Sequence, residues 1–295
     1  MSAAPRRVAA SLAALLGLAA LPACHSAAGR LEEANTLRRA GDSKAALARY
    51  KAVLADLGDE TLAPDQAAIR WKALKGAGDL SYLELGDYSG AIAYYRRIIS
   101  LYPASQESRD ARIAIGDIYR ERFQDNQAAI AQYADVAGTD APEAPKYQLE
   151  VAKAYLELKN YAQARTEARD LCRRWPQHAL ADDAQLLAAN AWSLEKRDQE
   201  ALAAFQALID RRPRAEILAR ALVAQAHIHA QAGHFARALE LYQKALPFHP
   251  NPDAIRVDIE AVRERQAKAQ PATPGDHDAA FDHDKRRAAA PAAEP

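Results

Sequence analysis

The sequence is poor in the residues that build disulfide frameworks and nucleic-acid-binding surfaces. Two cysteines among 295 residues cannot form a network of disulfides. The 39 basic and 39 acidic side chains cancel, so the chain carries no basic excess to attract the phosphates of a nucleic acid. We therefore predict neither a disulfide-stapled domain nor a nucleic-acid partner.

Signatures of catalysis are also missing. The chain contains no G-x-S-x-G, no phosphate loop of the G-x4-G-K-[ST] type and no H-E-x-x-H. Its closest pair of histidines, His227 and His229, would point about 200 degrees apart on a helix, because each residue turns the helix by about 100 degrees. We expect no enzyme activity, no cofactor and no metal site.

Long apolar runs are absent except for one, Val8–Ala23. It spans 16 residues and follows Arg6 and Arg7, which is the order of an export signal, and it is short for a membrane span of about 20 residues. The run ends in Leu-Pro-Ala-Cys, which resembles a bacterial lipobox. The resemblance implies that residues 1–23 are a lipoprotein signal peptide and that Cys24 receives the lipid.

The alternatives to lipidation are plain secretion after cleavage at Ala28 by the ordinary signal peptidase, or an uncleaved anchor. His25, where an Asp would retain a lipoprotein at the inner membrane, resembles the sorting default to the outer membrane of a Gram-negative cell. Residues 24–29 would then be a short tether, at most about 20 Å long. We expect an exported protein at the periplasmic face of the outer membrane.

What the chain does contain is a pattern of paired helices. In the stretch Gly233–Pro250, Ala238, Tyr242 and Ala245 follow the i, i+4, i+7 spacing of an amphipathic helix that a proline ends. Moving this pattern back by 37 residues places it on Ala201 and Phe205. Four further copies centre on Ala164, Ala129, Ala91 and Ala46, which brings the number of copies to six. Units of this size bury their apolar faces only by stacking on one another.

The pattern of small residue, aromatic residue and closing proline resembles the tetratricopeptide repeat (TPR). The resemblance implies an all-α fold, a right-handed superhelical solenoid of about six helix-turn-helix repeats over residues 30–270. Pro252–Gln270 is expected to cap it, with Ile255, Ile259 and Val262 facing inward. Residues 271–295 contain four prolines and two Asp-His-Asp triplets, and we expect a disordered, solvated tail rather than a metal site.

Two repeats depart from the common spacing. Ala46 and Ala91 are 45 residues apart rather than 37, and the excess falls near Asp56–Asp65, where Gly and Pro break a helix. The third repeat needs one extra residue, placed near Gln124–Asn126.

The junction from Tyr102 to Ala111, of the form Y-P-x-S followed by D-A, resembles exported TPR proteins. These include the BamD-type outer-membrane assembly lipoproteins and the CpoB-type periplasmic coordinators. The resemblance implies a protein-interaction scaffold in assembly of envelope complexes. The alternatives are a soluble periplasmic binding module and a pilotin-like carrier for a pilus or secretion subunit.

In the TPR family, one side of the first helix of each repeat lines a concave groove. Here that side carries an apolar rail, namely Ile113, Leu149, Leu186 and Val223. Beside it runs a polar row, namely Asp117, Lys153, Asn190 and His227. We predict that these residues bind an extended peptide or a partner helix. The alternative is that the rail only packs between adjacent helices.

Overall fold

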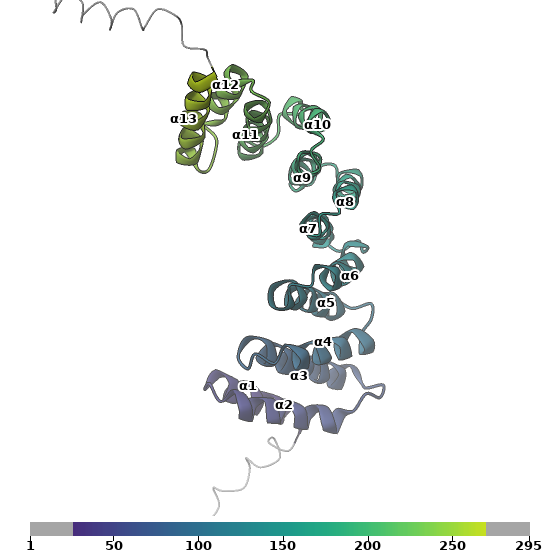
Figure 1. Cartoon of the computed structure of the whole chain (residues 1–295). Helices are drawn as coiled ribbons and strands as arrows, with labels where there is room; N and C mark the ends of the chain where they lie inside the picture. Colours follow the sequence, from purple (N-terminus) through teal and green to yellow (C-terminus); the bar gives the residue numbers. More distant parts are fainter. Residues whose placement is uncertain (1–25, 270–295) are drawn as a thin grey trace, which may run out of the picture. The chain divides into compact units, whose positions relative to one another are not determined.

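The protein is all-helical over residues 26–269, the part that the computed structural model describes. Figure 1 shows the helices in chain order. The elements are α1 (Ala27–Arg39), α2 (Ser43–Leu57), α3 (Pro64–Leu83), α4 (Tyr88–Leu101), α5 (Gln106–Ile118), η2 (Tyr119–Phe123), α6 (Asn126–Ala137), α7 (Ala144–Glu157), α8 (Tyr161–Arg174), α9 (Ala181–Leu194), α10 (Asp198–Asp210), α11 (Ala215–Gln231), α12 (Phe235–Ala245) and α13 (Pro252–Ala269). The six pairs from α1/α2 to α11/α12 are the predicted helix-turn-helix units, and α13 follows them.

The helices form two compact units, Met1–Ala154 and Tyr155–Pro295, each described by itself. The alanines that marked the repeats are fully buried in both. They are Ala46, Ala91 and Ala129 in the first unit and Ala164, Ala201 and Ala238 in the second, each 0% exposed. A side chain larger than a methyl group would hold the paired helices apart at these crossings. The predicted repeat register is therefore confirmed.

The turn inside each repeat is closed by local polar capping. In four repeats an Asp or Asn side chain accepts a hydrogen bond from the amide three residues on and begins the second helix: Asp42, Asp87, Asp125 and Asn160. Such a cap contributes about 1 kcal/mol. Gly41 and Gly86 adopt positive φ angles of 82° and 67° in two of these turns, and Gly233 adopts one of 80° in the turn before α12, a conformation that glycine adopts without steric cost.

Glycine also sets the close approach of the two helices in the third repeat. A Cβ built on Gly116 would lie 2.4 Å from the ring of Tyr133, which is fully buried. The tyrosine ring therefore occupies the space that a side chain on α5 would need.

The extra residue of the third repeat forms a turn of π-helix, η2, directly after α5. A π turn holds one more residue than an α turn, so the insertion is absorbed without a break in the helix. Gln124 then ends the helix with a left-handed φ of 54°. The insertion was predicted at Gln124–Asn126 and lies slightly earlier.

The longer insertion, between α2 and α3, is held by a buried arginine. Arg70 is 4% exposed and donates to the carbonyl oxygens of Gly58 at 3.0 Å and Glu60 at 2.8 Å. Its Nε donates to the Tyr102 hydroxyl at 2.9 Å. The guanidinium thus ties the inserted loop to the junction before α5.

The capping helix is confirmed over its described length. Ile255, Ile259 and Val262 are buried in one apolar cluster with Leu241 and Tyr242 of α12. The opposite face of α13 is exposed, as the last element of a solenoid requires.

The amino-terminal boundary differs from the prediction. The Ser26 side chain accepts the Gly29 amide at 3.0 Å, so α1 begins at Ala27, and the second half of the predicted tether 24–29 is helical. Ala27 and Ala28 lie in the first turn of α1, and alanine has the highest helix propensity of all residues. No helix in residues 26–269 has the length and apolarity needed to cross a membrane. The predicted signal peptide, Cys24 and the tail 271–295 lie outside the described residues.

Candidate functional site

The apolar rail is not uniform in its exposure. Ile113 and Val223 are partly exposed, while Leu149 and Leu186 are only 4% and 5% exposed. Leu149 and Leu186 therefore offer a partner little surface, and their burial agrees with the alternative that this part of the rail packs between helices. Burial depends on the size of the neighbouring side chains, which the position on a helix does not give.

The polar row has a structural role in the first unit. Asp117 accepts a hydrogen bond from the hydroxyl of buried Tyr133 at 2.6 Å. The same pairing joins Tyr95 to Asp79 at 2.8 Å, and Tyr50 to Asn35 at 2.7 Å. Each tyrosine follows its acceptor by 15 or 16 residues. This spacing was available in the sequence as a signal, and the analysis of the sequence missed it.

Asp117 is half-buried, and burial raises the pKa of its carboxyl, although the Tyr133 hydrogen bond opposes the shift. The folded protein therefore keeps this proton to a higher pH than the unfolded chain does. The free energy of unfolding therefore falls as the pH rises from the ordinary pKa of an Asp carboxyl, about 3.9, to the raised pKa of Asp117 in the folded protein.

We predict that Asp117→Asn, which keeps an acceptor for Tyr133 and removes the charge, gains stability relative to wild type as the pH rises from 3 to 7. Asp117→Leu should be about 1–3 kcal/mol less stable than Asp117→Asn at every pH, because the buried Tyr133 hydroxyl then has no acceptor. Urea denaturation at several pH values measures both. A stability difference between wild type and Asp117→Asn that does not change with pH would contradict the assigned burial.

Lys153 of the polar row is already engaged within the first unit. Its Nζ donates to Glu150 Oε1 at 2.8 Å, and Arg120 pairs with the other oxygen of the same carboxylate. Lys153 thus has an ion-pair partner on its own helix, a carboxylate that it shares with Arg120.

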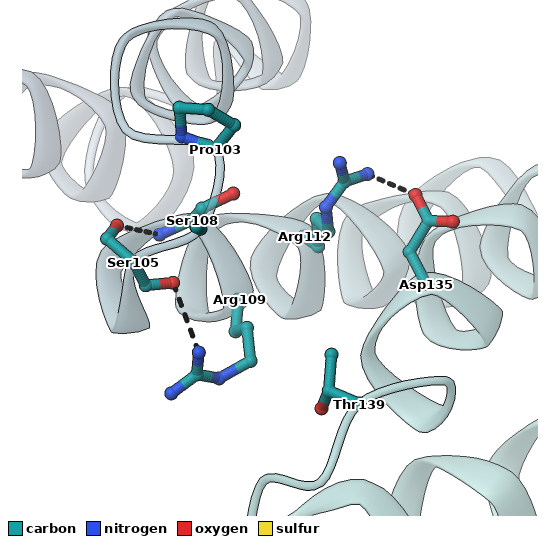
Figure 2. A pocket seen from close by; sticks show the side chains of 8 residues that line it. Pro103, Ser105, Ser108, Arg109, Arg112, Asp135 and Thr139 are labelled. Carbon is teal, nitrogen blue, oxygen red and sulfur yellow. Dashed lines mark hydrogen bonds and ion pairs between the residues drawn. The ribbon is translucent and has the colours of Figure 1, made fainter.

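A hollow of about 420 Å³ lies in the first unit, where the loop before α5 meets the end of α6. Its two arginines are occupied by the protein itself, since Arg112 pairs with Asp135 and Arg109 lies 3.2 Å from Glu143. Figure 2 shows their guanidinium groups pointing to different sides, toward the Ser105 carbonyl and toward Asp135. None of the predicted site residues lines this hollow. Its charges are balanced internally and do not converge on a common point.

A second hollow, of about 180 Å³, lies in the second unit and collects four predicted residues. We call it the α9–α11 groove, and its lining residues are Leu186, Asn190, Arg220, Val223, Ala224, His227 and His249. Helices α9 and α11, the first helices of adjacent repeats, contact each other here. The leucine, valine and alanine are apolar, and the other four side chains are polar or basic.

The histidines of the groove are fixed by neighbours. His227 Nε2 lies 3.2 Å from Asp258 Oδ2, and its ring meets the Tyr242 ring at a centroid distance of 5.6 Å. His249 Nδ1 lies 3.0 Å from the carbonyl oxygen and 3.2 Å from the amide nitrogen of Asn251. These contacts hold both rings in place at the edge of the groove.

The sequence pattern missed three groove residues, Arg220, Ala224 and His249. Arg220 lies one turn before Val223 on the same side of α11, so the helical period could have found it. His249 comes from the loop between α12 and α13, and only the fold brings it to the groove.

Five overlapping segments of the chain match the family model of the tetratricopeptide repeat: residues 31–105, 80–145, 118–179, 149–216 and 199–254. The chain belongs to the tetratricopeptide-repeat family. Repeats of this family present extended surfaces for binding other proteins and are in general not enzymes. A comparison with curated protein sequences gives no match.

Two solved structures with TM-scores above 0.5 share the fold. The apo form of RapI is 14% identical with a TM-score of 0.55, over 82% of this chain and 72% of that chain. Naa15/Naa10 bound to HypK-THB is 14% identical with a TM-score of 0.54, over 81% and 34%. YrrB, described as a TPR protein with an unusual peptide-binding site, is 14% identical with a TM-score of 0.47, over 72% and 97%. At these identities the likeness concerns the fold alone.

Proposed function

We propose that this TPR protein is an interaction scaffold that binds an extended segment of a partner protein in the α9–α11 groove. One observation carries the proposal. Residues at equivalent positions of adjacent repeats meet in a single hollow, Leu186 with Val223 and Asn190 with His227, each pair 37 residues apart in the sequence. The first helices of the two adjacent repeats thus each supply an apolar residue, which we call the floor of the groove, and a polar residue, which we call its edge.

The size and lining of the groove favour a peptide over a small molecule. Its volume of about 180 Å³ is below the range of about 300–1,000 Å³ that is typical of small-molecule sites. An apolar floor with polar edges suits an extended chain, whose side chains alternate between two sides. One or two side chains of such a segment would enter the groove.

We propose further that the scaffold is exported and lipid-anchored through Cys24 at the periplasmic face of the outer membrane, where it takes part in assembly of envelope complexes. The support is the sequence of residues 1–23, with its charged start and apolar run, and the cysteine directly after it. The finer likeness to assembly lipoproteins rests on the Tyr102–Ala111 junction.

The groove assignment is tested by site-specific photocrosslinking in cells of the source organism. A benzoylphenylalanine at Asn190 or Val223 should give discrete protein adducts, because both positions line the groove and are partly exposed. The same group at Ala203, exposed on α10, is the control. Adducts from Ala203 alone would place binding on another face and would refute the proposal.

A further inference from the structure

We infer that the α9–α11 groove selects an acidic segment: an extended peptide with an Asp or Glu side chain two positions from an apolar residue. This inference rests on the proposed function and names the chemistry of its partner.

The charge of the groove points to a carboxylate. None of its seven lining residues is acidic, whereas Arg220 is cationic. The nearest carboxylates lie outside the lining, Asp258 at 3.2 Å from His227 and Glu216 at 3.8 Å from Arg220. The lining itself therefore carries one cation and no carboxylate, so an acidic side chain that enters the groove can reach Arg220 without meeting a lining acid.

The hydrogen-bond donors of the groove are not used up by the protein. Within the described residues, Arg220 makes no hydrogen bond, and its side chain is 50% exposed beside Glu216. The Asn190 side-chain amide likewise has no partner in that part of the chain. The first unit differs, because Arg109 and Arg112 hydrogen-bond carboxylates there, whereas the ion pair of Arg220 with Glu216, at 3.8 Å, is longer than a hydrogen bond. A guanidinium with open donors binds a carboxylate through two parallel hydrogen bonds.

The spacing of the lining residues matches an extended chain. From Leu186 to Asn190, and from Val223 to His227, the helix rises by about 6 Å, at about 1.5 Å per residue. Side chains on one side of an extended segment repeat every second residue, at about 6.6 Å. An apolar side chain on the floor thus places the side chain two positions away beside the polar edge.

The test starts from a display library of random peptides, selected on the full-length protein in detergent. We expect enriched sequences to carry Asp or Glu two positions from an apolar residue. An enriched peptide and its Glu→Gln and Glu→Lys versions are then synthesised, and binding is measured by fluorescence anisotropy. The Glu peptide should bind about tenfold more tightly than the Gln peptide.

Variants of the protein give the decisive comparison. Arg220→Ala should lose about tenfold in affinity for the Glu peptide. Arg220→Glu should reverse the preference and favour the Lys peptide. The matched control is Arg237→Ala, an exposed arginine of α12 that pairs with Glu240, and it should bind as wild type does.

The outcomes separate the inference from the proposed function. Enrichment of neutral or basic peptides whose binding is lost in Val223→Asp overturns the acidic preference and leaves the groove as the binding site. No enrichment, or peptides that bind Val223→Asp as well as wild type, overturns both. Equal binding to anionic phospholipid vesicles and to the Glu peptide, independent of Arg220, would show charge attraction without a peptide site and would also overturn the inference.

Discussion

Replacing Ala201 with Phe should lower the free energy of unfolding by about 3 kcal/mol or more. Ala201 is 0% exposed and lies in one cluster with Ala189, Phe205 and Leu208, where α9 and α10 cross. The crossing has no free volume for a phenyl ring, so the helices must move apart. The side chains on both sides of the crossing then lose their packing. An overpacked core commonly costs about 1–3 kcal/mol, and a full benzyl group at a helix crossing belongs to the upper end.

The matched control is Ala203→Phe, two residues further along α10 at an exposed position. It should cost about 0.5 kcal/mol, the difference in helix propensity between the two residues. The same contrast is expected between buried Ala238 and exposed Ala236 in α12. Urea denaturation followed by circular dichroism measures all four variants. Equal midpoints within each pair would mean that the repeat register is wrong.

Replacing Cys24 with Ser should move the protein from the membrane fraction to the soluble fraction. Each CH₂ group of an acyl chain contributes about 0.8 kcal/mol to membrane binding, and stable anchoring takes more than one chain. A lipoprotein cysteine carries several, so a single substitution removes the entire anchor. Fractionation after a high-salt wash measures the result, and mass spectrometry of the amino-terminal peptide identifies the lipid.

The control is Cys172→Ser, because the second cysteine is partly buried in α8 and far along the chain from the signal. It should stay with the membranes. If Cys24→Ser also pellets with membranes, the lipid anchor is the wrong explanation of localisation. If it is released but still gives adducts from the groove, the binding function does not depend on the anchor.

The two hollows illustrate how a repeat fold separates stability from binding. In the first unit, Arg112 of α5 pairs with Asp135 of α6 inside one repeat, and Arg109 of α5 pairs with Glu143, which directly precedes α7 of the next repeat. In the α9–α11 groove, Arg220 lies 3.8 Å from the Glu216 carboxylate without a hydrogen bond to it, and Asn190 has no hydrogen-bond partner among the described residues. Paired side chains favour rigidity, while unpaired donors in a groove favour a ligand.

The sequence alone determined the fold and its register. The alanine positions recur at fixed spacing because helix period and helix contact are local requirements, and each repeat must meet the same steric condition at Ala164, Ala201 and Ala238. The capping stripe on α13 followed from the same period. The π turn at Tyr119–Phe123 was visible only as one surplus residue, since the sequence does not say which turn of the helix widens.

Tertiary structure decided which of the groove positions are open. Leu149 and Val223 occupy equivalent positions, yet the first is buried and the second partly exposed. Asp117 became the acceptor of a core tyrosine, while Asn190 at the equivalent position remained a free edge of the groove. His249 reached the groove through a loop. A helical period fixes the direction in which a side chain points, but its exposure depends on the sizes of side chains that other helices bring against it.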